Sequence, residues 1–426
     1  MTSVLEPGGP GRASVPGLAP GAVSAEPAGA SGPEGRISAV DGLRGVAVAL
    51  VVAFHYGLGL PGGFLGVDLF FVISGFVITR LLLAGRGLDR ASLARFWFRR
   101  AKRLLPALFL VVAGVQAWMV VQNPPGLRST ANAQTLAALT YTSNWYAIVG
   151  HVGYWDVSQS SAPLNHLWSL AIEEQFYLVW PLLLAVFLGV AARRGVERPL
   201  RRLAVLAIGI AAVCYLLAAV FYEPGSYDRA YMGTDTRAGA LLLGAVVACR
   251  PVSRRLVGAG PALAALLLLW GFARIDSGAF YTWQLPLAGV AAALLINAIA
   301  HHGEERADNR IVARVLENRP VMWVGRRSYG IYLWHWPVWV FLGVDYPGLS
   351  HTEAVALALG LSLVFAMASY RLVEFPVRYG TVRARIALPV FASCFAVLAI
   401  LAYLPVANPL DATNGPIVSG PHVVKP

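Results

Sequence analysis

The stretch D-G-L-R-G-V-A-V-A-L-V-V-A-F-H-Y, residues Asp41–Tyr56, decides how the chain is organised. It is apolar apart from its first residue, one arginine, Arg44, and eleven residues later one histidine, His55. On a helix, eleven steps of about 100° return His55 to within about 20° of the direction of Arg44, about 16 Å along the axis. Ionisable groups inside a bilayer are costly and commonly functional. The stretch therefore predicts a membrane helix with two functional side chains on one face. The alternative is that Arg44 snorkels to the interface and His55 only ends the span.

The composition indicates a polytopic membrane protein. Of 426 residues, 57% are hydrophobic and 13% are charged, and apolar runs of about 18 to 25 residues recur along the chain. The net charge of +12 comes mainly from arginines in the connections between these runs, as in cytoplasmic loops, so no nucleic-acid partner is predicted. The three cysteines have no metal-ligand spacing, and neither a disulfide framework nor a metal site is predicted.

The apolar runs predict an all-α fold of about eleven transmembrane helices. The expected spans cover residues 37–58, 62–84, 104–122, 166–190, 202–222, 236–250, 256–274, 281–300, 321–343, 353–374 and 386–405. The amino terminus is expected in the cytoplasm and the carboxyl terminus outside, because the basic clusters, including the connection 85–103, then all fall on the cytoplasmic side.

The chain is expected to have four parts. Residues 1–36, rich in proline and glycine, are predicted to be a disordered cytoplasmic tail. Residues 37–380 are expected to form the main membrane domain, and residues 386–405 one additional transmembrane helix. Residues 406–426 are expected to be a short extracytoplasmic tail.

The second apolar run contains G-F-L-G-V-D-L-F-F-V-I-S-G-F, residues 63–76. Asp68 is expected near its outer end, and Ser74 one to two turns deeper. An aspartate at this depth needs a partner, and His55, across a short connection, is the nearest candidate. Such a carboxylate would orient the imidazole and raise its basicity. The alternative is an interfacial Asp68 that only begins the helix.

The run R-R-A-K-R-L-L-P, residues Arg99–Pro106, is a candidate phosphate site. Guanidinium groups suit bidentate phosphate contacts. A phosphate-bearing acyl carrier from the cytoplasm, acyl-coenzyme A, would fit such a site. The predicted contacts are Arg99, Arg100, Lys102 and Arg103. The alternative is a cluster that only holds the loop on the cytoplasmic side.

The run N-H-L-W-S-L-A-I-E-E-Q-F-Y, residues Asn165–Tyr177, brings Glu173 and Glu174 into a span. Adjacent residues point about 100° apart on a helix, so one glutamate is expected to meet a buried arginine and the other to lie towards the interface. His166 and Glu173 are seven residues apart and share a face. The alternative is a charge pair that serves only packing.

Two shorter motifs supply supporting candidates. T-D-T-R, residues Thr234–Arg237, opens a span with Asp235 and Arg237. S-Y-G-I-Y-L-W-H-W-P, residues Ser328–Pro337, places His335 in an aromatic span, where a core histidine and a functional one are equally expected.

Together, these strings resemble the integral-membrane acyltransferase type 3 family over about residues 37–380. The matching motifs, in the family's order, are Arg44 with His55, G-V-D-L-F-F-V-I-S-G-F, R-R-A-K-R-L-L-P, W-S-L-A-I-E-E-Q-F-Y, T-D-T-R, Y-L-W-H-W-P and V-E-F-P-V-R. The resemblance implies a multi-pass enzyme of the cytoplasmic membrane. It would move an acyl group, most often acetyl, from cytoplasmic acyl-coenzyme A to a sugar hydroxyl of an extracytoplasmic glycan. No bound cofactor or metal is implied.

The resemblance also suggests a division of roles. The basic run would bind the nucleotide of acyl-coenzyme A, and Arg44 would hold the carrier while the thioester reaches His55. His55 would act as general base or as transient acyl acceptor, and Glu173 would pair with an arginine or orient the acceptor. Since only about twenty residues follow Leu404, the chain is expected to lack the soluble SGNH hydrolase-like domain that many members carry.

Two other functions stay open at this point. A tailoring acyltransferase for a glycosylated small molecule such as a macrolide differs only in its acceptor. A transporter or flippase for a glycan precursor is a different class, in which intramembrane charges gate the substrate.

Overall fold

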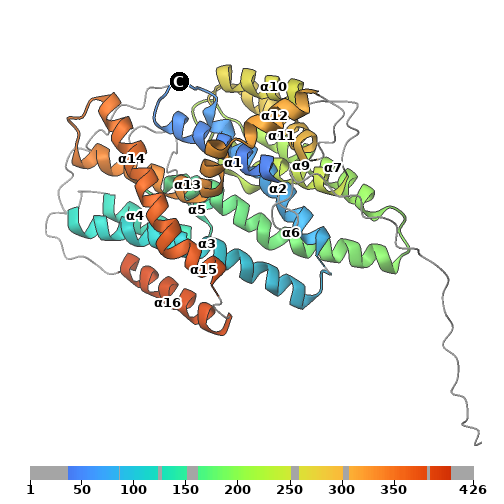
Figure 1. Ribbon diagram of the computed structural model, residues 1–426, viewed down its shortest axis with the longest axis horizontal. Helices are drawn as coiled ribbons and strands as arrows, with labels where there is room; N and C mark the ends of the chain where they lie inside the picture. Colours follow the sequence, from blue (N-terminus) through green and yellow to red (C-terminus); the bar gives the residue numbers. More distant parts are fainter. Residues whose placement is uncertain are drawn as a thin grey trace, which may run out of the picture. The chain divides into compact units, whose positions relative to one another are not determined.

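The protein is described by a computed structural model that covers residues 37–85, 87–122, 127–150, 162–250, 259–300, 307–380 and 384–403. The predicted tails, 1–36 and 406–426, lie outside these residues. Within them the chain is helical and contains no strand. All the described helices belong to one compact unit, which begins at Ser38 (Figure 1).

The first half of the chain supplies the helices that hold most of the predicted site residues. They are α1 (Ser38–His55), α2 (Gly66–Ala84), α3 (Arg90–Gln122), α4 (Leu127–Leu139), α5 (Ser143–Val149), α6 (Trp168–Arg193), α7 (Pro199–Val220), α8 (Asp228–Met232) and α9 (Thr234–Cys249). Short 3₁₀ turns, Gly63–Leu65 and Asn165–Leu167, lead into α2 and α6.

The second half continues with α10 (Ala259–Phe272), α11 (Leu285–Ala300), α12 (Ala307–Leu316), α13 (Arg319–Asp345), α14 (His351–Ser369), α15 (Phe375–Tyr379) and α16 (Ala384–Tyr403). π-helical turns at Phe280–Gln284 and Tyr370–Glu374 precede α11 and α15. α1 packs on α13, α2 packs on α9, and α16 lies at the edge of the bundle beside α3 and α4 (Figure 1).

Eight segments of the described chain are long and apolar enough to cross a membrane, which confirms a multi-pass membrane protein. They are Ser38–His55, Gly63–Ala84, Arg90–Gln122, Asn165–Arg193, Pro199–Val220, Phe280–Ala300, His351–Tyr379 and Ala384–Ala402. The other three expected spans correspond to α9, α10 and α13. With 16 and 14 residues, α9 and α10 are shorter than a bilayer requires, and α13 carries three arginines in its first half. The number eleven therefore stays a prediction.

The basic connection expected at 85–103 is helical from Arg90 onward and continues into the apolar part of α3. α3 runs unbroken for 33 residues, with Pro106 inside it. Asp89 caps it, accepting a 2.9 Å hydrogen bond from the backbone amide of Ser92. Hydrogen bonds from the hydroxyl and the amide of Ser92 lower the pKa of the Asp89 carboxyl. The arginines of this run therefore have fixed directions.

Glycines set the close contact between α2 and α9. A Cβ on Gly75 would lie 1.8 Å from the carbonyl oxygen of Leu241, and one on Gly244 would lie 2.0 Å from that of Val72. Small residues at such crossings allow helix backbones in membranes to approach closely. The crossing therefore tolerates no side chain at either position.

Replacing Gly75 by alanine is expected to push α2 and α9 apart and destabilise the protein by about 1–3 kcal/mol. Thermal unfolding of the purified protein in detergent measures this. Gly209→Ala in α7 is the matched control, because a Cβ there meets nothing within 4 Å. Equal unfolding temperatures for the two variants would show that the crossing can relax.

Candidate functional site

Three buried histidines from distant parts of the chain meet near the end of α1. His55 Nδ1 lies 2.8 Å from His335 Nε2, and their ring centroids are 5.0 Å apart. The ring of His166, in the turn before α6, lies edge-on to His335 at 5.5 Å. The three residues are 6%, 0% and 0% exposed. His166 and His335, predicted only as supporting residues, thus lie around His55.

Hydrogen bonds to the backbone hold this histidine cluster (His55, His166 and His335). His335 Nδ1 lies 2.6 Å from the carbonyl oxygen of Tyr332. The hydroxyl of Tyr332 donates to the carbonyl oxygen of His166 at 2.6 Å and lies 2.7 Å from Ser169 Oγ. The hydroxyl of Tyr56 donates to the carbonyl oxygen of His335 at 2.9 Å. The cluster is therefore built into the packing of α1, α6 and α13.

Asp68 pairs with Arg237, so the predicted partnership between Asp68 and His55 is wrong. Arg237 Nη2 donates to Asp68 Oδ2 at 2.8 Å, and the two side chains are 0% and 3% exposed. The Arg237 guanidinium also lies 4.6 Å from the centroid of the Tyr231 ring. The glycine crossing of α2 and α9 causes this pairing, because it brings the first turn of α2 against the first turn of α9.

The two charged residues of T-D-T-R have different partners. Asp235 accepts two hydrogen bonds from Arg229 of α8, at 2.9 and 2.6 Å, and this pair is partly exposed. Residues two apart on a helix point in different directions, so Asp235 and Arg237 serve separate contacts. Asp235 therefore lies in an ion pair with α8, separate from the buried pair of Arg237.

A second polar cluster lies nearer the start of α1, around Arg44. Tyr177 donates a 3.1 Å hydrogen bond to Glu173 Oε2, and the Arg100 guanidinium lies 4.1 Å from the centre of the Tyr177 ring. Arg44 interacts electrostatically with Glu173. We call Arg44, Arg100, Glu173, Glu174 and Tyr177 the inner charge cluster.

Both glutamates belong to this cluster, and the expectation that one of them lies towards the interface stays a prediction. Glu173 and Glu174 each interact electrostatically with Arg100. The Arg100 guanidinium from α3 thus acts on both carboxylates, although they leave α6 in different directions. Within the described chain, Glu174 Oε1 is buried and makes no hydrogen bond. Ser74 lies beside Glu173.

One face of α6 connects the two clusters. His166, Ser169, Glu173 and Tyr177 follow at spacings of three and four residues and so share a face. Ser169 contacts Tyr332 beside the histidines, and Glu173 interacts with Arg44. The predicted helix through Arg44 and His55 is confirmed as α1. Arg44 and His55 interact with opposite ends of this polar stripe, Arg44 with Glu173 and His55 with His166.

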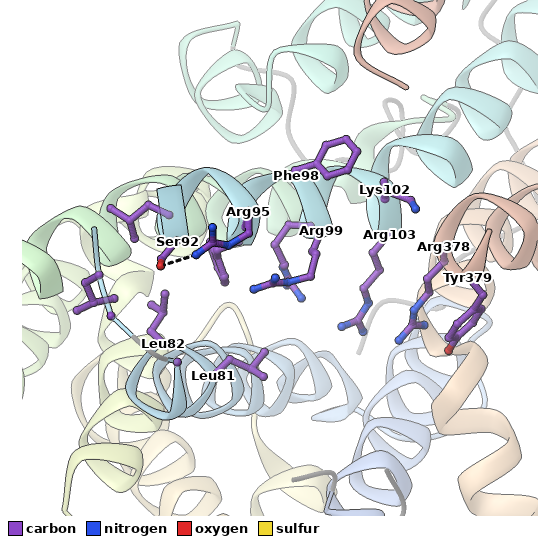
Figure 2. Close-up of a pocket in the computed structure, with 16 residues that line it drawn as sticks. Leu81, Leu82, Ser92, Arg95, Phe98, Arg99, Lys102, Arg103, Arg378 and Tyr379 are labelled. Carbon is purple, nitrogen blue, oxygen red and sulfur yellow. Dashed lines mark hydrogen bonds between the residues drawn. The ribbon is translucent and has the colours of Figure 1, made fainter. Parts of the chain in front are cut away.

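A basic cavity of about 640 Å³ lies between the end of α2, the first turns of α3, and α15. Six basic side chains and no acidic one are among its described lining residues: Arg95, Arg99, Arg100, Lys102, Arg103 and Arg378. Figure 2 shows Arg99, Arg103 and Arg378 pointing into the same space. Lys102 projects from another side of α3 and donates to the carbonyl oxygen of Gly380 at 3.1 Å.

The four predicted basic residues therefore line one cavity, and sequence reasoning missed two others. Arg95 could have been found, because Arg95, Arg99 and Arg103 are spaced four residues apart and share a helix face. Arg378 comes from α15 near the other end of the chain, and no sequence signal indicated that it would join α3.

Comparison with known proteins finds one matching family and relatives of that kind. The family model described as "Acyltransferase domain", that of acyltransferase type 3, matches residues 37–371. Peptidoglycan O-acetyltransferase OatA of Listeria monocytogenes is 33% identical over 362 residues, covering 80% of this chain and 56% of the relative. O-acetyltransferase OatA of Staphylococcus aureus is 34% identical over 389 residues, covering 86% of this chain and 61% of the relative.

The chain thus spans little more than half the length of these curated relatives. No solved structure matches it.

Proposed function

Because this chain belongs to the acyltransferase type 3 family, whose domain covers residues 37–371, we propose that it is a membrane O-acetyltransferase. It moves an acetyl group from acetyl-coenzyme A in the cytoplasm to a sugar hydroxyl of an extracytoplasmic glycan. The relative from Listeria monocytogenes is named for peptidoglycan, so peptidoglycan is the first acceptor to test. The protein acts in the cytoplasmic membrane, with its amino terminus inside.

The basic cavity is the observation that carries this proposal. Coenzyme A bears several phosphates, and six cations without a lining acid suit their negative charge. Arginines from α3 and α15 converge on this cavity (Figure 2). The first turns of α3 are rich in arginine, which supports a cytoplasmic position for the cavity. A phosphate-bearing donor can therefore enter from the side on which it is made.

The transfer itself takes place at the histidine cluster. His55 lies about 16 Å beyond Arg44 along α1, a distance comparable to an extended pantetheine arm. As the acceptor oxygen attacks the thioester carbonyl, its proton moves to His55, and the new C–O bond forms. The C–S bond then breaks, and the coenzyme A thiolate leaves with the proton that His55 took up.

Glu173 and Arg44 position the donor in this scheme. Their mutual attraction and the hydrogen bond from Tyr177 to Glu173 hold the guanidinium side chain beside the α6 stripe. Arg44 then offers N–H donors to the amide carbonyls of pantetheine. No metal and no resident cofactor takes part in the proposed reaction.

The function is tested by coenzyme A release. Membranes that contain the protein should release free coenzyme A from acetyl-coenzyme A only when peptidoglycan fragments are added, and mass spectrometry should find the fragments acetylated. Transport of a glycan precursor would release no coenzyme A. Glycans and glycosylated metabolites from a strain that lacks the gene are then compared with those of the parent strain. If their acetylation is the same in both strains, the proposal is wrong.

Replacing Arg99 or Arg103 by glutamine is expected to raise the KM for acetyl-coenzyme A about tenfold, because a charge-assisted contact to phosphate is lost. The kcat should change little, since the histidine cluster is untouched. The KM of both variants should also depend less on salt than that of the native protein.

The matched control is Arg202→Gln, which removes an exposed arginine of α7 away from the cavity. An unchanged KM in the Arg99 and Arg103 variants would place the nucleotide elsewhere.

A further inference from the structure

His335 has a defined tautomer in this structure. Its Nδ1 lies 2.6 Å from the carbonyl oxygen of Tyr332, and a carbonyl only accepts, so Nδ1 carries the proton. The ring is 0% exposed, and a buried charge without a counter-ion is costly. The contacts of His335 in the described chain include backbone, tyrosine and histidine groups but no carboxylate. The ring is therefore neutral, and its Nε2 has only a lone pair.

This lone pair determines the tautomer of His55. His55 Nδ1 lies 2.8 Å from His335 Nε2, and because that nitrogen can only accept, Nδ1 of His55 must donate. A neutral imidazole carries one proton, so the lone pair of His55 is on Nε2. We infer that His335 is a positioning residue, which keeps His55 in the Nδ1–H tautomer and makes Nε2 the nitrogen that accepts the acceptor's proton.

This inference rests on the proposed function for its chemistry. In catalytic triads a carboxylate orients the base through the second ring nitrogen. Here a neutral imidazole, itself fixed by a backbone carbonyl, makes the same contact without adding a negative charge inside the membrane. When His55 accepts a proton at Nε2, its Nδ1–H becomes part of a cation, and the hydrogen bond to His335 strengthens. The contact thus stabilises the charge that develops during transfer.

Neighbouring contacts hold the imidazole rings of His55 and His335 in their relative positions. The hydroxyl of Tyr56, the residue after His55, donates to the carbonyl oxygen of His335 at 2.9 Å. The ring of Trp336 lies 4.9 Å from that of His55. α1 and α13 also approach closely, since a Cβ on Gly325 would lie 1.7 Å from the carbonyl oxygen of Asp41. The 2.8 Å distance is therefore a property of the packed helices.

Two amide substitutions separate this role from simple packing. His335→Gln places an amide oxygen close to the position of Nε2 and retains an acceptor for His55. His335→Asn places its amide close to the position of Nδ1 and leaves His55 without that acceptor. We expect kcat to fall about 100-fold in His335→Asn and less than about tenfold in His335→Gln. The KM for acetyl-coenzyme A should be unchanged in both.

Both variants are compared at equal amounts of folded protein, judged by unfolding temperature. A kcat for His335→Asn equal to or above that of His335→Gln would overturn the inference.

A second readout does not depend on activity. In protein labelled with ¹⁵N-histidine, the His55 signals, identified by their loss in His55→Gln, should show a protonated Nδ1. The same tautomer should persist in His335→Gln and become mixed in His335→Asn. A protonated Nε2 in the native protein would overturn the inference even if acetyl transfer is observed. If the tautomer is as expected but no acetyl transfer occurs, the proposed function is wrong, and the inference about the tautomer of His55 stands.

Discussion

Replacing His55 by alanine is expected to reduce acetyl transfer by at least about 10³-fold, because the reaction loses the group that takes the acceptor's proton. The basic cavity lies between the end of α2 and the first turns of α3, and none of the three histidines is among its described lining residues, so acetyl-coenzyme A should still bind with nearly native affinity. The measurement is the rate of coenzyme A release by purified protein, together with equilibrium binding of labelled acetyl-coenzyme A.

The control for this variant is His351→Ala, which removes an exposed histidine at the first residue of α14. It should leave the rate of coenzyme A release unchanged. Native activity in a folded His55→Ala protein would exclude His55 both as base and as acyl acceptor, and the proposed mechanism with it.

Replacing Arg237 by methionine is expected to destabilise the protein by about 3–5 kcal/mol, because the buried Asp68 carboxylate loses its counter-ion. Neither side chain of the pair is more than 3% exposed, so water cannot take the place of the guanidinium. Thermal unfolding in detergent, followed by light scattering or intrinsic fluorescence, measures the loss.

The double variant Asp68→Leu/Arg237→Met should recover much of that stability, since apolar side chains can replace a buried ion pair when both charges are removed. Coenzyme A release by the double variant then tests whether Asp68 has any role beyond the pair. A double variant no more stable than Arg237→Met would show that the carboxylate is not the source of the destabilisation.

The local features of the site could be predicted from the sequence. The helix through Arg44 and His55 is present as expected, because its apolar run and its length suffice to specify a span. The basic run could be recognised by composition, and the spacing of Arg95, Arg99 and Arg103 by helical periodicity. The all-α class and the multi-pass character follow from the same apolar runs.

The partners of the polar groups could not be predicted in the same way. Asp68 was assigned to His55 because the connection between their helices is short, yet it pairs with Arg237. The partner of Asp68 depends on where α2 crosses α9, and Gly75 and Gly244 determine this crossing through close backbone contacts. Such contacts produce no periodic pattern in the sequence. From the sequence, His335 fitted a core role and a functional role equally well. The packing of α13 against α1 brings its Nε2 beside His55.

The sequence by itself determined which segments are membrane helices, which residues share a helix face and where positive charge gathers, because these properties depend on neighbours within a few turns. Only the tertiary structure decided that three histidines meet, that Arg378 joins the arginines of α3, and that Asp68 contacts Arg237. The physical reason is that contacts between helices depend on backbone separation and crossing geometry, which arise from many side chains far apart in the chain.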